Sequence, residues 1–276
     1  MVSTKRSRRR TPVRSARRNR FGLQTLPLVA LVLATVLGGC APGTPASRSV
    51  EVVASFPHDQ AAFTQGLLWH DGHVFESTGL YGSSSVRKVR LADGAVLMQR
   101  DLPEDLFGEG LALVGDTLIQ LTWRAGDAYV WPLDSFERAV TRFGYDGEGW
   151  GLCFDGARLV MSDGSDRLTF RDPDTFDVIG GVDVTFDGQP LAQLNELECV
   201  DGRVWANVWF EDRIVEIDPS SGQVVSYADL ARLLTETERS GLGRDDVLNG
   251  IAYRDDTGTF LVTGKRWPKV FEIALR

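Results

Sequence analysis

Five polar or aromatic side chains recur at the same point of a repeated pattern in this chain. Each lies two positions before a Leu or Ile that opens an apolar stretch, and the five are Gln65, Glu109, Trp150, Asn195 and Asn249. Only Glu109 is an acid, a side chain that can take up and release protons in catalysis. If the positions are equivalent in a structural repeat, they meet around one axis, and Glu109 stands in a ring of amides and an indole. This ring is a candidate active site.

A second group of residues recurs ten to fourteen positions after each repeat Leu or Ile, where the next strand is expected. Adjacent antiparallel strands place such residues beside the first group. The predicted site therefore combines four polar side chains with a cage of indoles: Glu109, Gln65, Asn195 and Lys265 with Trp123, Trp150 and Trp209.

The spacing of the repeat residues predicts the fold. Leu67, Leu111, Leu152 and Leu197 follow one another at intervals of 41 to 45 residues, and Ile251 comes after a longer interval of 54. A four-stranded blade of a β-propeller takes about 40–45 residues. Within each repeat, short alternating or apolar runs are broken by Asp-Gly, Gly-Asp or Ser-Gly turns, which is typical of β-strands. We therefore predict an all-β, five-bladed propeller; a β-sandwich with irregular spacing is the alternative.

Two further segments complete the predicted propeller. The last repeat has room for only three strands, and residues 49–55 alternate like a strand before the first repeat, so this N-terminal strand is expected to close the last blade. Residues 229–239 have helical periodicity, with Leu230, Leu233 and Leu234 on one face. They predict one surface helix inserted before the fifth blade.

The N-terminus has the three parts of an export signal. Residues 1–39 hold nine Lys or Arg and no acid, and they include an uncharged apolar run at 26–37, too short for a membrane span. Leu37-Gly-Gly-Cys40 resembles a bacterial lipobox, which implies a lipid on Cys40; a plain secretory signal or an uncleaved anchor is the alternative. We expect residues 1–39 to be a lipoprotein-type signal peptide, 40–49 a flexible tether and 50–276 the propeller domain. The protein would be anchored in a membrane and face the periplasm or cell exterior.

The charge of the chain excludes one class of partner. The formal net charge is −8, although nine of the 30 basic residues lie in the leader. The remaining body is strongly acidic, which argues against nucleic acid, because binding of nucleic acid rests on Lys and Arg that meet phosphate.

Two cysteines, Cys153 and Cys199, follow repeat Leu residues in neighbouring repeats. Export permits a disulfide between them. Two small buried hydrophobic side chains are the alternative, and the sequence leaves both open.

Seven motifs of the chain resemble those of the plant and bacterial type of glutaminyl-peptide cyclotransferase (glutaminyl cyclase). They occur in the family's order between about residue 51 and the C-terminus: Phe63-Thr-Gln-Gly-Leu67, Glu76-Ser-Thr-Gly-Leu-Tyr-Gly82, Phe107-Gly-Glu-Gly-Leu111, Glu148-Gly-Trp-Gly-Leu152, Leu194-Asn-Glu-Leu-Glu198, Val204-Trp-Ala-Asn-Val-Trp209 and Val262-Thr-Gly-Lys-Arg-Trp-Pro268. The resemblance implies a five-bladed propeller that converts N-terminal Gln of peptides or proteins to pyroglutamate and releases ammonia.

The resemblance also implies the roles of eight residues. Glu109 is expected to be the catalytic acid/base, and the pocket is expected to contain Phe63, Gln65, Trp123, Trp150, Asn195, Trp209 and Lys265. Asn249 shares the repeat phase, but its role stays open.

We expect no metal or cofactor in the reaction. The chain has three His residues, at 58, 70 and 73, and no zinc-ligand spacing. The Asp-rich turns could supply oxygen ligands, so a structural Ca²⁺ in the channel stays an open alternative. The expected partners are peptides with N-terminal Gln, the expected state is a monomer, and the only expected membrane contact is the lipid anchor.

Other interpretations of the same residues lead to other functions. A single Trp in a propeller is usually a core residue, Glu109 alone would be an exposed loop acid, and Lys265 alone a surface charge. His58 and His70 are assigned to the surface. A non-catalytic propeller that binds peptides or glycans is the main alternative. A metal-dependent lactonase-like hydrolase is another, but it should need several acids around the axis.

Overall fold

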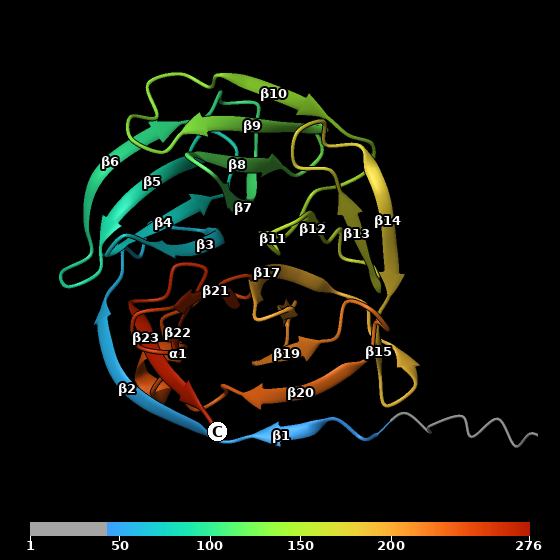
Figure 1. Ribbon diagram of the computed structural model, residues 1–276. Coiled ribbons are helices and arrows are strands. Elements are labelled where there is room, and N and C mark those ends of the chain that lie inside the picture. Colours follow the sequence, from blue (N-terminus) through green and yellow to red (C-terminus); the bar gives the residue numbers. More distant parts are fainter. Residues whose placement is uncertain (1–42) are drawn as a thin grey trace, which may run out of the picture. The chain divides into compact units, whose positions relative to one another are not determined.

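Five β-sheets, antiparallel except for one parallel edge strand, surround a central axis in the computed structural model, which describes residues 43–276 (Figure 1). The predicted signal peptide and the predicted lipidation site at Cys40 lie outside the described residues. The predicted all-β, five-bladed propeller is confirmed. None of the helices formed by residues 43–276 is long and apolar enough to cross a membrane.

The first three blades each have four strands in sequence order. The first blade is β3 (Thr64–His70), β4 (His73–Thr78), β5 (Ser85–Arg90) and β6 (Ala95–Asp101). The second is β7 (Gly108–Val114), β8 (Thr117–Thr122), β9 (Asp127–Pro132) and β10 (Thr141–Gly144). The third is β11 (Leu152–Phe154), β12 (Leu159–Met161), β13 (Arg167–Arg171) and β14 (Val178–Asp183).

The fourth and fifth blades both take a strand from the N-terminal segment. The fourth is β17 (Leu194–Val200), β18 (Arg203–Val208), β19 (Arg213–Ile217) and β20 (Val224–Asp229), with β1 (Ala46–Arg48) at its edge. The fifth is β21 (Leu248–Arg254), β22 (Thr259–Gly264) and β23 (Lys269–Leu275), completed by β2 (Val50–Pro57). A small hairpin, β15 (Thr185–Phe186) and β16 (Gln189–Pro190), precedes the fourth blade.

The N-terminal strand closes the ring as predicted. Strand β2 pairs antiparallel with β23, from Val50 opposite Leu275 to Pro57 opposite Lys269. Strand β1 was not expected, because its residues fall in the segment for which a flexible tether is predicted. It pairs parallel with β20, and Arg48 Nη2 lies 2.9 Å from Glu216 Oε2. This pairing covers an edge that would otherwise expose unpaired backbone groups.

The inserted helix is much shorter than predicted. Helix α1 contains only Glu236–Ser240, and Thr235 caps it by accepting from the Glu238 backbone N–H. The three Leu residues assigned to one face of a longer helix precede α1 and are buried in the core between the fourth and fifth blades. The helical interpretation of residues 229–235 was wrong, because the spacing of buried Leu residues in a folded-in loop imitates a helical face.

Glycines let the inner strands approach one another around the axis. A Cβ on Gly66 would lie 2.6 Å from Leu111 N, and a Cβ on Gly110 would lie 2.5 Å from Leu152 N. A Cβ on Gly151 would lie 2.0 Å from the Asn195 carbonyl oxygen. These approaches explain why Gly follows the first three phased residues, since any side chain there would push neighbouring blades apart.

In the fourth repeat, Glu196 takes the place of this Gly and fills the centre of the ring. Its Oε1 accepts from Leu67 N at 3.2 Å and its Oε2 from Ile251 N at 2.7 Å. The side chain is fully buried. A carboxyl group of the fourth blade therefore satisfies backbone donors of the first and fifth blades.

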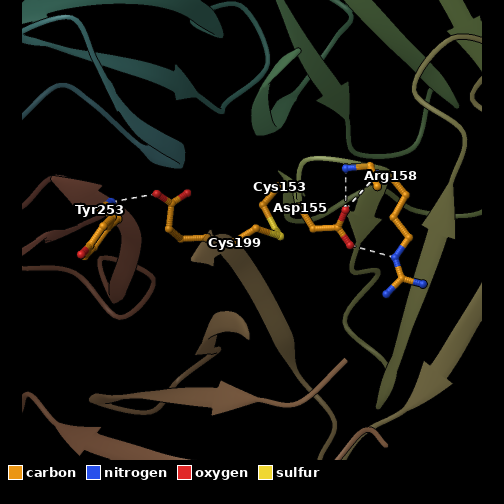
Figure 2. Close-up of a disulfide and its surroundings, with 7 residues drawn as sticks. Cys153, Asp155, Arg158, Cys199 and Tyr253 are labelled. Carbon is orange, nitrogen blue, oxygen red and sulfur yellow. Dashed lines mark hydrogen bonds and ion pairs between the residues drawn. A yellow bond between two sulfur atoms is a disulfide. The ribbon is translucent and has the colours of Figure 1, made fainter. Parts of the chain in front are cut away.

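A disulfide joins the inner strands of the third and fourth blades. Figure 2 shows Cys153 on β11 bonded to Cys199 on β17, with the two Cα atoms 5.5 Å apart. Of the two possibilities that the sequence leaves open, the structure has the bridge. Because it links residues 46 apart in sequence, it restricts the unfolded chain as well as holding the two blades together.

His58 is not a surface residue, contrary to the prediction. Its side chain is 4% exposed, its Nε2 lies 3.0 Å from Glu76 Oε1, and its Nδ1 lies 2.8 Å from the Trp267 carbonyl oxygen. Glu76 also forms an ion pair with Arg87 at 2.8 Å. A buried carboxylate needs such partners, and sequence spacing did not reveal that His58 supplies one. His70 is partly exposed.

Candidate active site

A cavity of about 320 Å³ brings together all eight predicted site residues. Its lining consists of Phe63, Gln65, Leu80, Phe107, Glu109, Trp123, Trp150, Asn195, Trp209, Asp245 and Lys265. Three of these, Leu80, Phe107 and Asp245, were missed. Leu80 and Phe107 lie within motifs that carry the family resemblance, so the motifs could have identified both as cavity residues. Asp245 precedes the fifth blade outside any repeat phase, and nothing in its spacing distinguishes it.

Glu109 lies on β7 with its carboxyl group facing the cavity. The residue is 4% exposed, and Oε1 accepts a hydrogen bond of 2.9 Å from Gln65 Nε2. Burial raises the pKa of Glu109 well above its usual range, while the charge of Lys265 acts in the opposite direction and that of Glu148 adds to the rise. The sequence left open whether burial or Lys265 dominates; burial does. A carboxyl group with a raised pKa is suited to both accepting and returning a proton.

Lys265 follows β22 and brings a cation to the same cavity. The residue is 4% exposed, and its Nζ lies 4.9 Å from the centre of the Phe63 ring and 5.8 Å from that of Trp209. Burial lowers the pKa of Lys265, and the negative charge of Glu109 opposes this. Within residues 43–276, no carboxylate oxygen approaches Nζ to 4.0 Å. The ammonium group is therefore held by aromatic faces and faces the cavity without a close counter-ion.

Glu148 fixes two of the three indoles of the cage. Trp123 Nε1 and Trp150 Nε1 donate to Glu148 Oε2 at 2.8 and 3.1 Å, and Arg124 Nε donates to Oε1 at 2.9 Å. The Trp150 ring meets the Trp209 ring edge-on, with the centres 5.3 Å apart. Glu148 belongs to one of the motifs, but sequence reasoning gave it no role. It orients the cage from outside the cavity lining.

Three buried polar atoms of the cavity have no hydrogen-bond partner among residues 43–276. They are Glu109 Oε2, Asn195 Oδ1 and Trp209 Nε1. Two are acceptors and one is a donor. Leaving a buried polar group unpaired costs about 1–3 kcal/mol, and because all three residues line the cavity, a bound molecule could supply the missing partners.

Asn249 does not line the cavity but holds a residue that does. Its Nδ2 donates to the backbone oxygen of Thr64 at 3.0 Å and to Gln65 Oε1 at 3.1 Å. The Gln65 carboxamide is thereby held with its NH₂ group toward Glu109 Oε1. Asn249, the fifth residue of the repeat phase, whose role the sequence left open, thus orients Gln65, the first.

Replacing Asn249 with Leu is expected to raise the pKa of Glu109. The variant removes the donor that orients the Gln65 carboxamide, and the hydrogen bond from Gln65 is one of the contacts that lower this pKa. The ionisation of Glu109, followed by NMR of the labelled side chain, should move to higher pH. Replacing Asn207, a second buried Asn that accepts from Gly250 N instead, should not move it. An unchanged titration in Asn249→Leu would contradict the role assigned to Asn249.

The axis of the propeller holds two more carboxyl groups, both on β17. Burial raises the pKa of Glu196 well above its usual range, and burial also raises the pKa of half-buried Glu198 to about 8. Glu198 Oε1 accepts from Tyr253 N at 2.8 Å, the bond drawn to Tyr253 in Figure 2. The five phased positions hold one acid, as the sequence indicates, but these two at neighbouring positions were missed. Among residues 43–276, no group of three or more His, Cys, Asp or Glu side chains is arranged to hold a metal ion.

Replacing Glu198 with Gln is expected to increase thermal stability at alkaline pH. The folded-state pKa of about 8 lies above that of an unfolded-chain Glu, near about 4.3. Folding therefore favours the protonated form, and the wild type loses stability as the pH rises between these two values. The Tm difference between the variant and the wild type, from circular dichroism, should be small at pH 4 and grow toward pH 8. Parallel curves over this range would contradict the prediction.

Comparisons with known proteins give a consistent result. Residues 27–275 match the family model described as glutamine cyclotransferase. The chain is 42% identical over 230 residues to the glutaminyl-peptide cyclotransferase of Arabidopsis thaliana, a match that covers 83% of this chain and 72% of the relative. The crystal structure of Myxococcus xanthus glutaminyl cyclase superposes with a TM-score of 0.77 at 40% identity, covering 84% of this chain and 98% of that one.

Proposed function

The chain belongs to the glutamine cyclotransferase family and is a glutaminyl cyclase; from this premise, we propose that it cyclises N-terminal Gln by a metal-independent reaction in which Glu109 moves the proton. The observation that carries the proposal is the set of unpaired atoms Glu109 Oε2, Asn195 Oδ1 and Trp209 Nε1 in one cavity with Lys265. An N-terminal Gln has matching groups, namely N–H donors on its α-amine and a carbonyl oxygen on its side chain.

The aromatic walls have a clear task in this reaction. The α-amine must reach the carbon of its own side-chain carboxamide, so the flexible Gln side chain has to fold back on itself. A cavity walled by Phe63 and the three indoles can hold the folded form and raise the effective concentration of the amine at the carbon. The α-amine titrates near about pH 8, so a neutral fraction exists at working pH.

One carboxyl group is enough to transfer the proton from the attacking amine to the leaving nitrogen. Glu109 Oε2 accepts a proton as the amine nitrogen attacks the carboxamide carbon and the new C–N bond of the lactam forms. Lys265 and Trp209 Nε1 donate to the oxygen of the tetrahedral intermediate, which carries the developing negative charge. Glu109 then delivers the proton to the side-chain nitrogen, the old C–N bond breaks, and ammonia leaves. Asn195 Oδ1 accepts from an N–H of the reacting nitrogens.

The proposal is tested with residues 41–276 and a peptide that begins with Gln. Mass spectrometry should show a loss equal to one ammonia, and the same peptide with an acetylated α-amine should stay unchanged, because the nucleophile is blocked. If the protein converted no more peptide than buffer alone does, the proposed enzymatic activity would be contradicted. Tight binding without conversion would support the alternative of a non-catalytic propeller that binds peptides.

Metal independence is tested in the same assay. We expect the initial rate to be the same with and without EDTA. A lower rate in EDTA would contradict the metal-free reaction. A structural Ca²⁺ in the channel would be recognised by a lower Tm in EDTA with the rate at room temperature unchanged.

We propose for the whole chain that it is exported as a monomer and anchored through lipid on Cys40. The proposal rests on the basic, apolar and Leu-Gly-Gly-Cys parts of the leader. Metabolic labelling with a fatty acid should mark the wild type and not Cys40→Ala. Labelling of both would place the lipid elsewhere, and labelling of neither would favour a plain secretory signal.

A further inference from the structure

Two exposed aromatic rings lie next to the cavity. Among residues 43–276, Tyr81 and Phe210 are the only aromatic residues among the exposed large hydrophobic ones, at 54% and 47% exposed. The others are aliphatic and lie away from the cavity lining, for example Val52 on β2 and Val178 on β14. Exposed apolar side chains are unremarkable singly, but two that both adjoin a binding cavity suggest a contact with a ligand.

Each exposed ring continues the aromatic wall of the cavity outward. The Tyr81 ring meets the Phe107 ring with the centres 5.5 Å apart, and Phe107 lines the cavity. The centre of the Phe210 ring lies 4.4 Å from that of the Trp209 ring, which lines the cavity on the fourth blade. The aromatic surface therefore extends from the buried cage to solvent on both the first and the fourth blade.

The backbone beside both rings adopts an uncommon conformation. Leu80, which lines the cavity directly before Tyr81, has a φ of +88°, and Phe210 has a φ of +67°. Non-glycine residues seldom adopt these values, which cost of order 1 kcal/mol or more and persist where the surroundings impose them.

We propose that Tyr81 and Phe210 form a subsite that packs against a large apolar or aromatic side chain at the second position of the peptide substrate. The inference rests on the proposed function, since a cavity filled by the N-terminal Gln leaves the following residue at the cavity mouth. Aromatic and aliphatic side chains gain there by leaving water and by ring-to-ring contact, while Gly gains nothing. The subsite thus favours N-terminal Gln-Phe over Gln-Gly.

The test compares kcat/KM for three peptides that differ only in their second residue, which is Phe, Gly or Lys. The wild type should convert the Phe peptide about tenfold more efficiently than the Gly peptide, mainly through KM, a difference that one aromatic contact can supply. Phe210→Ala, Tyr81→Ala or both should lower this ratio toward one, and Phe210→Tyr should keep it. Val178→Ala, which removes an apolar side chain that is 61% exposed on outer strand β14, should also keep it.

The outcomes separate this inference from the proposed function. A ratio near one in the wild type, with both peptides converted, would overturn the subsite and leave the cyclase intact. A higher efficiency for the Lys peptide would mean that the rings bind a cation and would also overturn the inference. Conversion of none of the three peptides would instead contradict the proposed function.

Discussion

Replacing Glu109 with Gln is expected to lower kcat by about 10²–10⁴-fold, the usual contribution of a general acid–base group. The variant keeps the shape of the side chain and an oxygen that can accept from Gln65 Nε2, so the cavity should still bind the substrate. It cannot accept the proton of the α-amine or return it to the leaving nitrogen. The loss should therefore appear in kcat, measured by ammonia release under steady-state conditions, with a small change in KM.

Glu198→Gln is the matched control for this variant, because it changes a second axial carboxyl group that lies outside the cavity lining. Its kcat should stay close to that of the wild type at neutral pH. If Glu109→Gln kept full kcat, Glu109 would not be the proton carrier. If both variants lost activity equally, the effect would come from the axis of the propeller and not from proton transfer in the cavity.

Replacing Lys265 with Met is expected to lower kcat/KM by about 10²–10³-fold, the range seen when one donor to a developing oxyanion is removed. The positive charge of Lys265 also holds the pKa of Glu109 lower than burial alone would set it. Without this charge the pKa of Glu109 rises further, and a larger fraction of the carboxyl groups is protonated at a given pH. The acidic limb of the profile of kcat/KM against pH should therefore move to higher pH.

Lys269→Met is the control for the loss of a lysine charge close to Lys265 in the sequence. Lys269 Nζ forms an ion pair with Glu238 and does not line the cavity. Its pH profile should match that of the wild type. A Lys265→Met variant with a reduced rate but an unmoved acidic limb would mean that the ammonium group acts on the substrate alone and does not set the ionisation of Glu109.

The repeat phase in the sequence predicted most of the site, because residues at equivalent positions of successive blades lie around the same axis in a propeller. Gln65, Glu109 and Asn195 lie on the innermost strands, so equal phase places them around one axis. The same argument placed Asn249 in the ring, but it could not tell that Asn249 lies behind Gln65 instead of facing the cavity. Whether a side chain faces a cavity or a neighbour depends on packing that no local pattern contains.

Other features depended on contacts between distant residues. The buried His58 and the bonds from Glu196 to two other blades each arise from partners that are far away in the sequence. The helical periodicity of residues 229–235 shows the limit clearly, because a loop whose Leu residues fold into the core can carry the same spacing. The unpaired atoms of the cavity, which carry the proposed mechanism, are likewise visible only in three dimensions.

The most direct test of the proposed reaction uses a Gln-initiated peptide whose side-chain amide nitrogen is labelled with nitrogen-15. Intramolecular attack by the α-amine predicts that the wild type releases all of the label as ammonia and leaves a peptide lighter by that ammonia, while Glu109→Gln releases almost none in the same time. Release of the label with a product that has gained an oxygen, as hydrolysis of Gln to Glu would give, would contradict cyclisation. Retention of the label in the peptide would contradict the reaction altogether.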